Sequence, residues 1–92
     1  MPRPCKRRRV RGRPNSSYFK PAGIRKIELD EIILDNSEFE AIRLKDSLDL
    51  EQNECAVKMN ISQPTFHRIL SSARKKLADA IVNGKAIKIG NN

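Results

Sequence analysis

The sequence has few aromatic side chains and few soft metal ligands, and each shortage excludes a class of function. Tryptophan is absent, and one tyrosine and three phenylalanines are the only aromatic residues. This content argues against a large stacking platform for single-stranded nucleic acid. Cys5 and Cys55 lie fifty positions apart, and His67 is the only histidine. That spacing matches neither a zinc site nor a disulfide framework, so we expect no metal.

Long apolar runs are also missing. No stretch approaches membrane-spanning length, and the charged N-terminus lacks the apolar centre of a signal peptide, so we expect a cytoplasmic protein. The 92 residues suffice for one small domain with a modest core and no enclosed substrate cavity. No nucleophile–base pair, carboxylate dyad or phosphate-binding glycine loop is present. We therefore expect no enzymatic activity.

Positive charge is concentrated at the two ends of the sequence. The net charge is +8 at pH 7, and residues 1–26 hold ten lysines and arginines and no acidic residue. Residues 27–61 hold three basic and ten acidic residues, whereas residues 62–92 hold six basic residues and one acidic residue. This layout indicates a polyanionic partner, for which nucleic acid is the simplest explanation.

The first seventeen residues form a basic arm with little apolar content. We expect residues 1–17 to be flexible and residues 18–92 to form the folded domain, because the arm has too little apolar surface to fold alone. Its arginines can neutralise phosphates or enter a narrow minor groove; they are Arg7, Arg8, Arg9, Arg11 and Arg13. Residues 11–14, RGRP, also look like the core of an AT-hook. A general electrostatic arm and a solvated tail without a role are the alternatives.

Residues 52–82 predict two helices joined by a tight turn. The first helix places three apolar side chains at helical spacing; they are Cys55, Ala56 and Met59. Asn60 tolerates the left-handed backbone conformation that a sharp helix exit requires. Ser62 then caps the second helix, and Pro64 falls in its first turn, where no N–H is missed.

The second of these helices has an apolar side and a polar side and ends at Asn83-Gly84. Its apolar residues recur at i, i+3, i+4 and i+7 as one stripe; they are Phe66, Ile69, Leu70, Ala73, Leu77, Ala80 and Ile81. The whole arrangement resembles the helix-turn-helix of DNA-binding proteins, in which the second helix lies in the major groove. An ordinary helical hairpin without a ligand is the alternative.

The polar side of this helix supplies the candidate DNA contacts. The residues that we expect to reach base edges are Gln63, His67 and Arg68. The candidates for phosphate are Ser62, Thr65, Arg74, Lys75 and Lys76, and Ser71 lies on the same side. His67 is not expected to bind a metal or to act in catalysis, since nothing nearby completes either site.

A shorter helix is predicted to begin after Asp35. With Asp35 as N-cap, Glu38 completes a capping box, and Leu34 and Phe39 occupy the positions of a hydrophobic staple. The side chains that we expect to face the core are Phe39, Ile42 and Leu44, and the helix is expected to fade near residues 46–47. The acidic residues of this section are Asp35, Glu38, Glu40, Asp46, Asp49, Glu51 and Glu54. We expect them to form a solvated face, with a contact surface for a protein partner as the alternative.

Two stretches are rich in β-branched residues. Residues 27–34 predict a short strand or an irregular pair of extended segments, and residues 86–89 are the candidate partner. The predicted fold class is therefore mainly α, a helix-turn-helix domain with a short two-stranded β pairing.

Three stretches together resemble a known family. They are the N-terminal MPRP followed by basic residues and YFKPAG, the central EFEAIRLKD, and QPTFHRILSSARKKLADAIVNGKA. They are similar to small, largely uncharacterised prokaryotic proteins predicted to bind DNA through a helix-turn-helix like the fourth region of bacterial sigma factors. The resemblance covers nearly the whole chain and implies a helical DNA-binding domain, a non-enzymatic role and no cofactor. Glu51 stands where a serine cap is usual, and Asn60 stands where glycine is usual.

These observations predict a sequence-specific DNA-binding protein that regulates transcription. We expect a homodimer on double-stranded DNA, because a single recognition helix usually needs a second copy or an arm. One alternative is a sequence-indifferent protein that binds DNA or structured RNA. The other is an adaptor that binds the transcription machinery through the acidic middle section.

Overall fold

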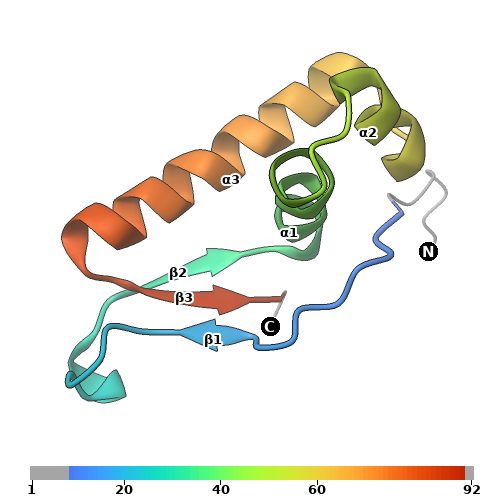
Figure 1. Cartoon of the computed structure of the whole chain (residues 1–92). Helices are drawn as coiled ribbons and strands as arrows, with labels where there is room; N and C mark the ends of the chain where they lie inside the picture. Colours follow the sequence, from blue (N-terminus) through green and yellow to red (C-terminus); the bar gives the residue numbers. More distant parts are fainter. Residues whose placement is uncertain (1–8, 91–92) are drawn as a thin grey trace, which may run out of the picture.

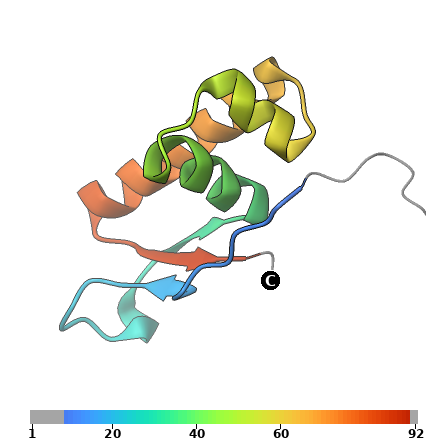
Figure 2. The ribbon, with the colours of Figure 1, turned by 45° about the vertical axis from the view of Figure 1, so that its right-hand side comes forward.

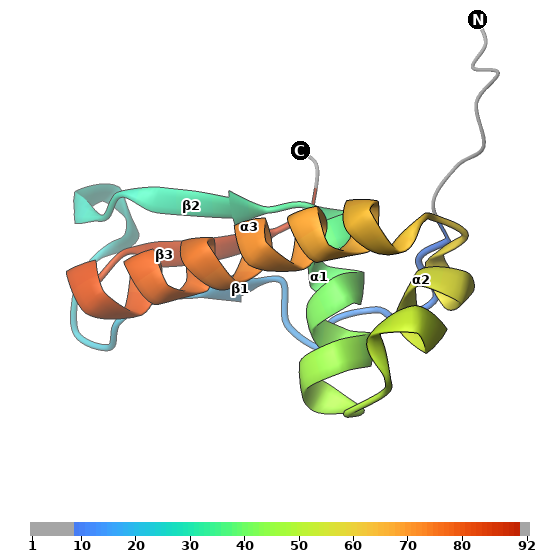
Figure 3. The ribbon, with the colours of Figure 1, turned by 90° about the horizontal axis from the view of Figure 1, so that it is seen from above.

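The computed structural model describes residues 9–90, which form two layers (Figure 1). One layer is a three-stranded sheet, whose strands are β1 (Tyr18–Phe19), β2 (Glu31–Leu34) and β3 (Ala86–Ile89). The long helix α3 (Gln63–Asn83) runs across the sheet, and from above it lies over β3 (Figure 3). The helices α1 (Asn36–Ile42) and α2 (Gln52–Met59) gather towards the N-terminal end of α3. The protein is therefore mainly helical with a small sheet.

The C-terminal strand β3 is the centre of the sheet because it pairs along both of its edges. It runs antiparallel to β1, with Ile87 opposite Phe19. It runs parallel to β2, with the same Ile87 opposite Ile32. The predicted pairing between the two β-branched stretches is thus confirmed, and it brings the two ends of the folded domain together.

The sheet differs from the predicted two-stranded pairing in the number of strands. The third strand, Tyr18–Phe19, is only two residues long, which is too short for an alternating pattern to reveal it. The stretch before β2 is also not a strand: Lys26–Glu28 form a single 3-10 turn, η1, and Ile27 is 87% exposed. β-branched content alone therefore overestimates the length of β2.

Local hydrogen bonds begin α1 where the sequence predicts. The Asp35 carboxylate accepts from the Glu38 N–H at 2.8 Å, and the Glu38 carboxylate accepts from the Asp35 N–H at 2.9 Å. The predicted capping box is therefore confirmed. After Ile42 the helix widens into a π-helical turn, η2 (Arg43–Ser47). The predicted core-facing residues are all buried or half-buried; they are Phe39, Ile42 and Leu44.

The hydrophobic core lies where α1, η2, α2 and the first half of α3 meet. Its buried members are Ala41, Leu44, Cys55, Ala56, Met59, Phe66 and Leu70. Phe66 is fully buried and is among the largest of these side chains. Cys55 is a core residue, as predicted, and burial raises the pKa of its thiol. This core fixes how α2 and α3 sit against each other.

The apolar stripe of α3 extends this core towards the sheet. Five of its buried or half-buried positions alternate by four and three residues; they are Phe66, Leu70, Ala73, Leu77 and Ala80. The predicted stripe residue Ile69 is also half-buried and packs against the core. The prediction is wrong for Ile81, which is 78% exposed although it lies four residues after Leu77 on the same side of the helix. Within residues 9–90, no helix combines the length and the apolarity that crossing a membrane requires.

Candidate nucleic-acid interface

The turn between α2 and α3 is defined by main-chain hydrogen bonds. Asn60 adopts the left-handed conformation, with φ 60° and ψ 45°. The N–H of Asn60 donates to the Val57 carbonyl, and the N–H of Ile61 donates to the Ala56 carbonyl, each at 3.0 Å. This pair of bonds is a Schellman motif, which ends a helix abruptly. The turn predicted at Asn60 is confirmed.

Ser62 begins α3 as the predicted N-cap. Its hydroxyl oxygen accepts from the Thr65 N–H at 3.3 Å, and the hydroxyl donates to Thr65 Oγ1 at 2.9 Å. Pro64 lies in the first turn, as predicted. The same Thr65 oxygen accepts from Arg68 Nη2 at 3.4 Å. The first turn of α3 therefore holds Ser62, Thr65 and Arg68 in one chain of polar contacts.

The first half of α3 buries one side and exposes a polar side. The buried side chains are Phe66, Leu70 and Ala73. Of the predicted contact residues, Thr65 and Lys76 are half-buried and the following are exposed: Ser62, Gln63, His67, Arg68, Ser71, Arg74 and Lys75. Because the buried side packs into the core, the direction of the polar side is set by the fold.

Two of the predicted phosphate contacts are paired with carboxylates. Arg74 donates from Nε and Nη2 to the Asp46 carboxylate at 3.1 and 2.5 Å. This hydrogen-bonded pair lowers the pKa of Asp46 and raises that of Arg74. Lys76 donates to the Glu38 carboxylate and to the Ile33 carbonyl, each at 2.7 Å.

Arg68 and Lys75 differ from these two residues. Among residues 9–90, neither forms an ion pair. They are therefore the cations that the polar side of α3 presents to a partner.

The part of the basic arm that the structure describes is bonded to the domain. The Arg9 N–H donates to the carbonyl of Met59, the last residue of α2, at 3.1 Å. The N–H groups of Arg11 and Gly12 donate to the two carboxylate oxygens of Glu40 at 3.2 and 3.1 Å. We call residues 9–14 the anchored segment; in Figure 2 it runs, in blue, past α1 towards α2.

Because of these bonds, the basic arm contacts the folded domain from residue 9, well before the predicted boundary at residue 18. The sequence does not reveal them because the acceptor, Glu40, lies 28 and 29 positions further along the chain. The side chains of Arg9, Arg11 and Arg13 are exposed. Arg7 and Arg8, the other predicted arm contacts, lie outside the described residues.

Glu40 is the residue of this surface that sequence reasoning missed. It is 2% exposed, and Arg43 donates to its two oxygens from Nε and Nη2, each at 2.9 Å. Burial acts to raise the pKa of Glu40, but the bonds from Arg43, Arg11 and Gly12 outweigh it and lower the pKa. The carboxylate therefore stays charged while four donors surround it. The i,i+3 spacing from Glu40 to Arg43 is the one sequence signal for this pair.

Glu38 is the second buried carboxylate of α1, and it joins α1 to α3. It accepts from Ser72 Oγ at 2.6 Å and from Lys76. Burial acts to raise its pKa, and the bonds from Lys76, Ser72 and the Asp35 N–H together lower it. The predicted solvated acidic face is thus wrong for Glu38 and Glu40.

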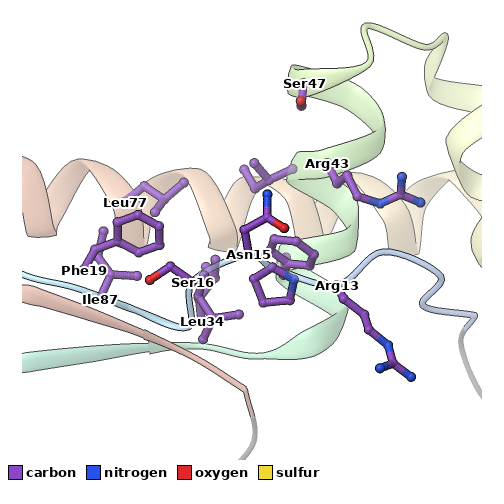
Figure 4. Close-up of a pocket in the computed structure, with 13 residues that line it drawn as sticks. Arg13, Asn15, Ser16, Phe19, Leu34, Arg43, Ser47, Leu77 and Ile87 are labelled. Carbon is purple, nitrogen blue, oxygen red and sulfur yellow. The ribbon is translucent and has the colours of Figure 1, made fainter.

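An apolar groove of about 650 Å³ lies between α1, α3, the sheet and residues 13–16 (Figure 4). Its apolar walls include Phe39, Ile42, Leu77 and Ile87, and no acidic residue lines it. Within the described part of the chain, no three His, Cys, Asp or Glu side chains gather closely enough to hold a metal ion.

The fold and this surface define a small, mainly helical domain with a cationic helix face and a three-stranded sheet. The chain belongs to the family described as "Protein of unknown function DUF134", whose model matches residues 1–91. This confirms the predicted membership of a small prokaryotic family.

Relatives in this family are closely similar over most of the chain. A UPF0251 protein of Caldanaerobacter subterraneus subsp. tengcongensis is 61% identical over 89 residues, which cover 97% of this chain and 75% of that protein. A UPF0251 protein of Pelotomaculum thermopropionicum is 55% identical over 89 residues, which cover 97% of this chain and 67% of that protein. No solved structure matches the chain.

Proposed function

We propose that this protein binds a specific duplex DNA sequence and regulates transcription, with α2, the turn and α3 acting as a helix-turn-helix. The observation that carries the proposal is the first half of α3. It follows a sharp Schellman turn, buries one side in the core and exposes Gln63, His67 and Arg68. The major groove, about 12 Å wide, admits such a helix, and the N-terminal residues of a recognition helix contact base edges.

The charges around this helix support phosphate contacts on either side of the groove. Lys75 is exposed on α3, and Arg9, Arg11 and Arg13 are exposed on the anchored segment. Arg74 adds to this set because its ion pair with Asp46 lies at the surface, with the two side chains 54% and 35% exposed. A surface pair contributes only about 0–1 kcal/mol, so a DNA phosphate can replace the carboxylate at little cost.

The structure favours DNA binding over the adaptor alternative. Two of the acidic residues that would form a protein-binding face, Glu38 and Glu40, are buried, and Asp46 is paired with Arg74. The acidic surface is thus smaller than the sequence predicts. The basic surface of α3 is exposed and next to a capped helix start. We further propose that two copies bind one site, since one recognition helix reads few base pairs.

Selection of bound DNA from a random duplex pool, at two salt concentrations, tests the proposal. An enriched motif is the expected result, and a palindrome would support the homodimer. Binding without enrichment would replace the proposal by a sequence-indifferent binder, whose affinity depends steeply on salt. Failure to bind duplex DNA at either salt concentration would contradict the proposal and favour the alternative function, an adaptor that binds another protein.

Arg68→Ala is the sharpest single substitution for the same proposal. If Arg68 reads a guanine, its loss should cost about 1–3 kcal/mol of binding free energy at one base position and relax selection there. Arg25→Ala is the matched control, because the Arg25 side chain is 78% exposed and, within residues 9–90, pairs with nearby Glu28. Equal losses on all sequences would instead make Arg68 a phosphate contact.

A further inference from the structure

The anchored segment is held through its main chain, which leaves its arginine side chains exposed. The three bonds that fix it come from the N–H groups of Arg9, Arg11 and Gly12. Two successive N–H groups that converge on one anion form a concave binding site, here filled by the Glu40 carboxylate. The guanidinium groups of Arg9, Arg11 and Arg13 are therefore not consumed by the anchor.

Gly12 packs closely against the Arg43 side chain at this anchor. Its φ is not in the left-handed region, so backbone conformation does not demand a glycine. A Cβ at this position would instead overlap Nε and Cδ of Arg43. Those atoms belong to the side chain that donates twice to Glu40. A larger residue at position 12 would therefore require the Arg43 side chain or the anchored segment to shift.

The far end of the anchored segment lies at the turn between α2 and α3. Arg9 is bonded to Met59, which directly precedes the turn residue Asn60. The anchor thus brings Arg9 to the turn between the two helices.

We propose that Glu40, Arg43 and Gly12 are positioning residues for DNA binding. They hold the anchored segment beside the helix-turn-helix, so that its arginines contact DNA phosphates next to the groove that α3 enters. This inference rests on the proposed function. A cation held in place loses less freedom on binding than one on a free tail, and this difference appears as affinity. The same contact also replaces the AT-hook interpretation, because the Gly12 N–H is bonded to Glu40.

The first measurement needs no DNA. Cys5 can carry a nitroxide, since Cys55 is fully buried and burial raises the pKa of its thiol. Cys5 is four residues from Arg9, within about 14 Å along the chain. The label should broaden the amide signals of Asn60 and Ile61 in the unaltered protein and broaden them much less in Gly12→Ala. Equal broadening in both proteins would overturn the anchor.

The second measurement compares affinity for the selected duplex over a range of salt concentrations. Gly12→Ala and Glu40→Gln should each weaken binding roughly three- to tenfold, as expected when the arginines are no longer held at a high effective concentration beside the DNA. The slope of the logarithm of the binding constant against the logarithm of the salt concentration should become shallower by about 0.9 for each phosphate that is no longer neutralised. This change is expected in Gly12→Ala even though that substitution removes no positive charge. Ser17→Ala is the control in the same part of the chain, because its hydroxyl donates no hydrogen bond within residues 9–90.

The outcomes separate the anchor from the proposed function. Wild-type affinity and salt slope in both variants would overturn the positioning role, while DNA binding itself would stand. Failure of the unaltered protein to bind DNA would overturn both the proposed function and the positioning role, and the nitroxide result would then report on the anchor alone. Amide exchange of α3 in each variant should match that of the unaltered protein; faster exchange in Glu40→Gln would assign Glu40 to stability, and Gly12→Ala would then decide.

Discussion

The two halves of α3 share one apolar stripe, but their exposed sides carry different kinds of side chain. In the first half, Arg68 forms no ion pair within residues 9–90 and lies among polar neighbours. In the second half, Lys76 is bonded to Glu38, and Ile81 and Val82 are each 78% exposed. Among the described residues, the first half therefore presents an unpaired cation among polar side chains, whereas the second half combines paired cations and the unpaired Lys75 with exposed apolar side chains.

The difference follows from what packs against each half. The first half closes the core with α2 and α1, and within the described residues no carboxylate pairs with Arg68. Further along, α1 brings Glu38 to Ser72 and Lys76, and η2 brings Asp46 to Arg74. A cation of α3 is thus paired or unpaired according to its tertiary neighbour and not according to its position in the stripe. We expect substitutions in the two halves to separate stability from DNA binding.

The largest expected effect is on the buried side of the first half. Phe66→Ala should lower the free energy of unfolding by about 3–5 kcal/mol, because it opens a cavity in the core. Ile81→Ala, at a position of the same helix that is 78% exposed, should change it by less than about 0.5 kcal/mol. Urea denaturation of the unaltered protein and both variants measures these changes in the free energy of unfolding. Similar losses in the two variants would show that the apolar stripe continues to Ile81.

The next effect concerns the carboxylate that ties α1 to α3. Because the pKa of Glu38 is lowered in the folded protein, its stabilisation is present above the unfolded value of about 4.3 and is lost as the pH falls through the folded pKa. Glu38→Gln should cost about 1–3 kcal/mol at pH 7, since Lys76 loses its charged partner. The same variant should lose less stability than the unaltered protein on acidification. Parallel acid unfolding curves for the two proteins would contradict this account.

The smallest expected effect concerns the turn. Asn60→Gly should stabilise the protein slightly, because glycine adopts φ 60° without the strain of a Cβ. Asn60→Ala should instead lower the free energy of unfolding by about 1–2 kcal/mol. Thermal unfolding of both variants gives the comparison, with the Arg68-dependent selectivity expected to survive in Asn60→Gly. A stabilised Ala variant would show that the left-handed conformation is not retained.

Much of the candidate interface follows from local sequence. The capping box at Asp35, the left-handed exit at Asn60 and the cap at Ser62 are all confirmed. Each depends on bonds between residues at most five positions apart, which is why a single sequence reveals them. The family resemblance and the charge of the two ends also pointed to nucleic acid, and that function stays a proposal.

The features that sequence reasoning missed depend on contacts between distant residues. Strand β1 exists because β3 offers it a free edge. In the sequence Glu40 resembles any other surface carboxylate, whereas in the structure the anchored segment and Arg43 donate hydrogen bonds to it. The prediction of a flexible arm likewise did not include the hydrogen bonds to Glu40, because no residue of the arm itself indicates that acceptor.

The sequence by itself determined where the helices begin and end, which side of α3 is apolar, and that positive charge gathers at both ends. The tertiary structure decided which charges stay unpaired and which are used internally. The physical reason is that capping and periodicity are short-range, whereas the pairing of a charge depends on which element packs opposite it. Arg68 and Arg74 lie six residues apart on one helix, and among residues 9–90 only Arg74 pairs with a carboxylate, that of Asp46 on η2.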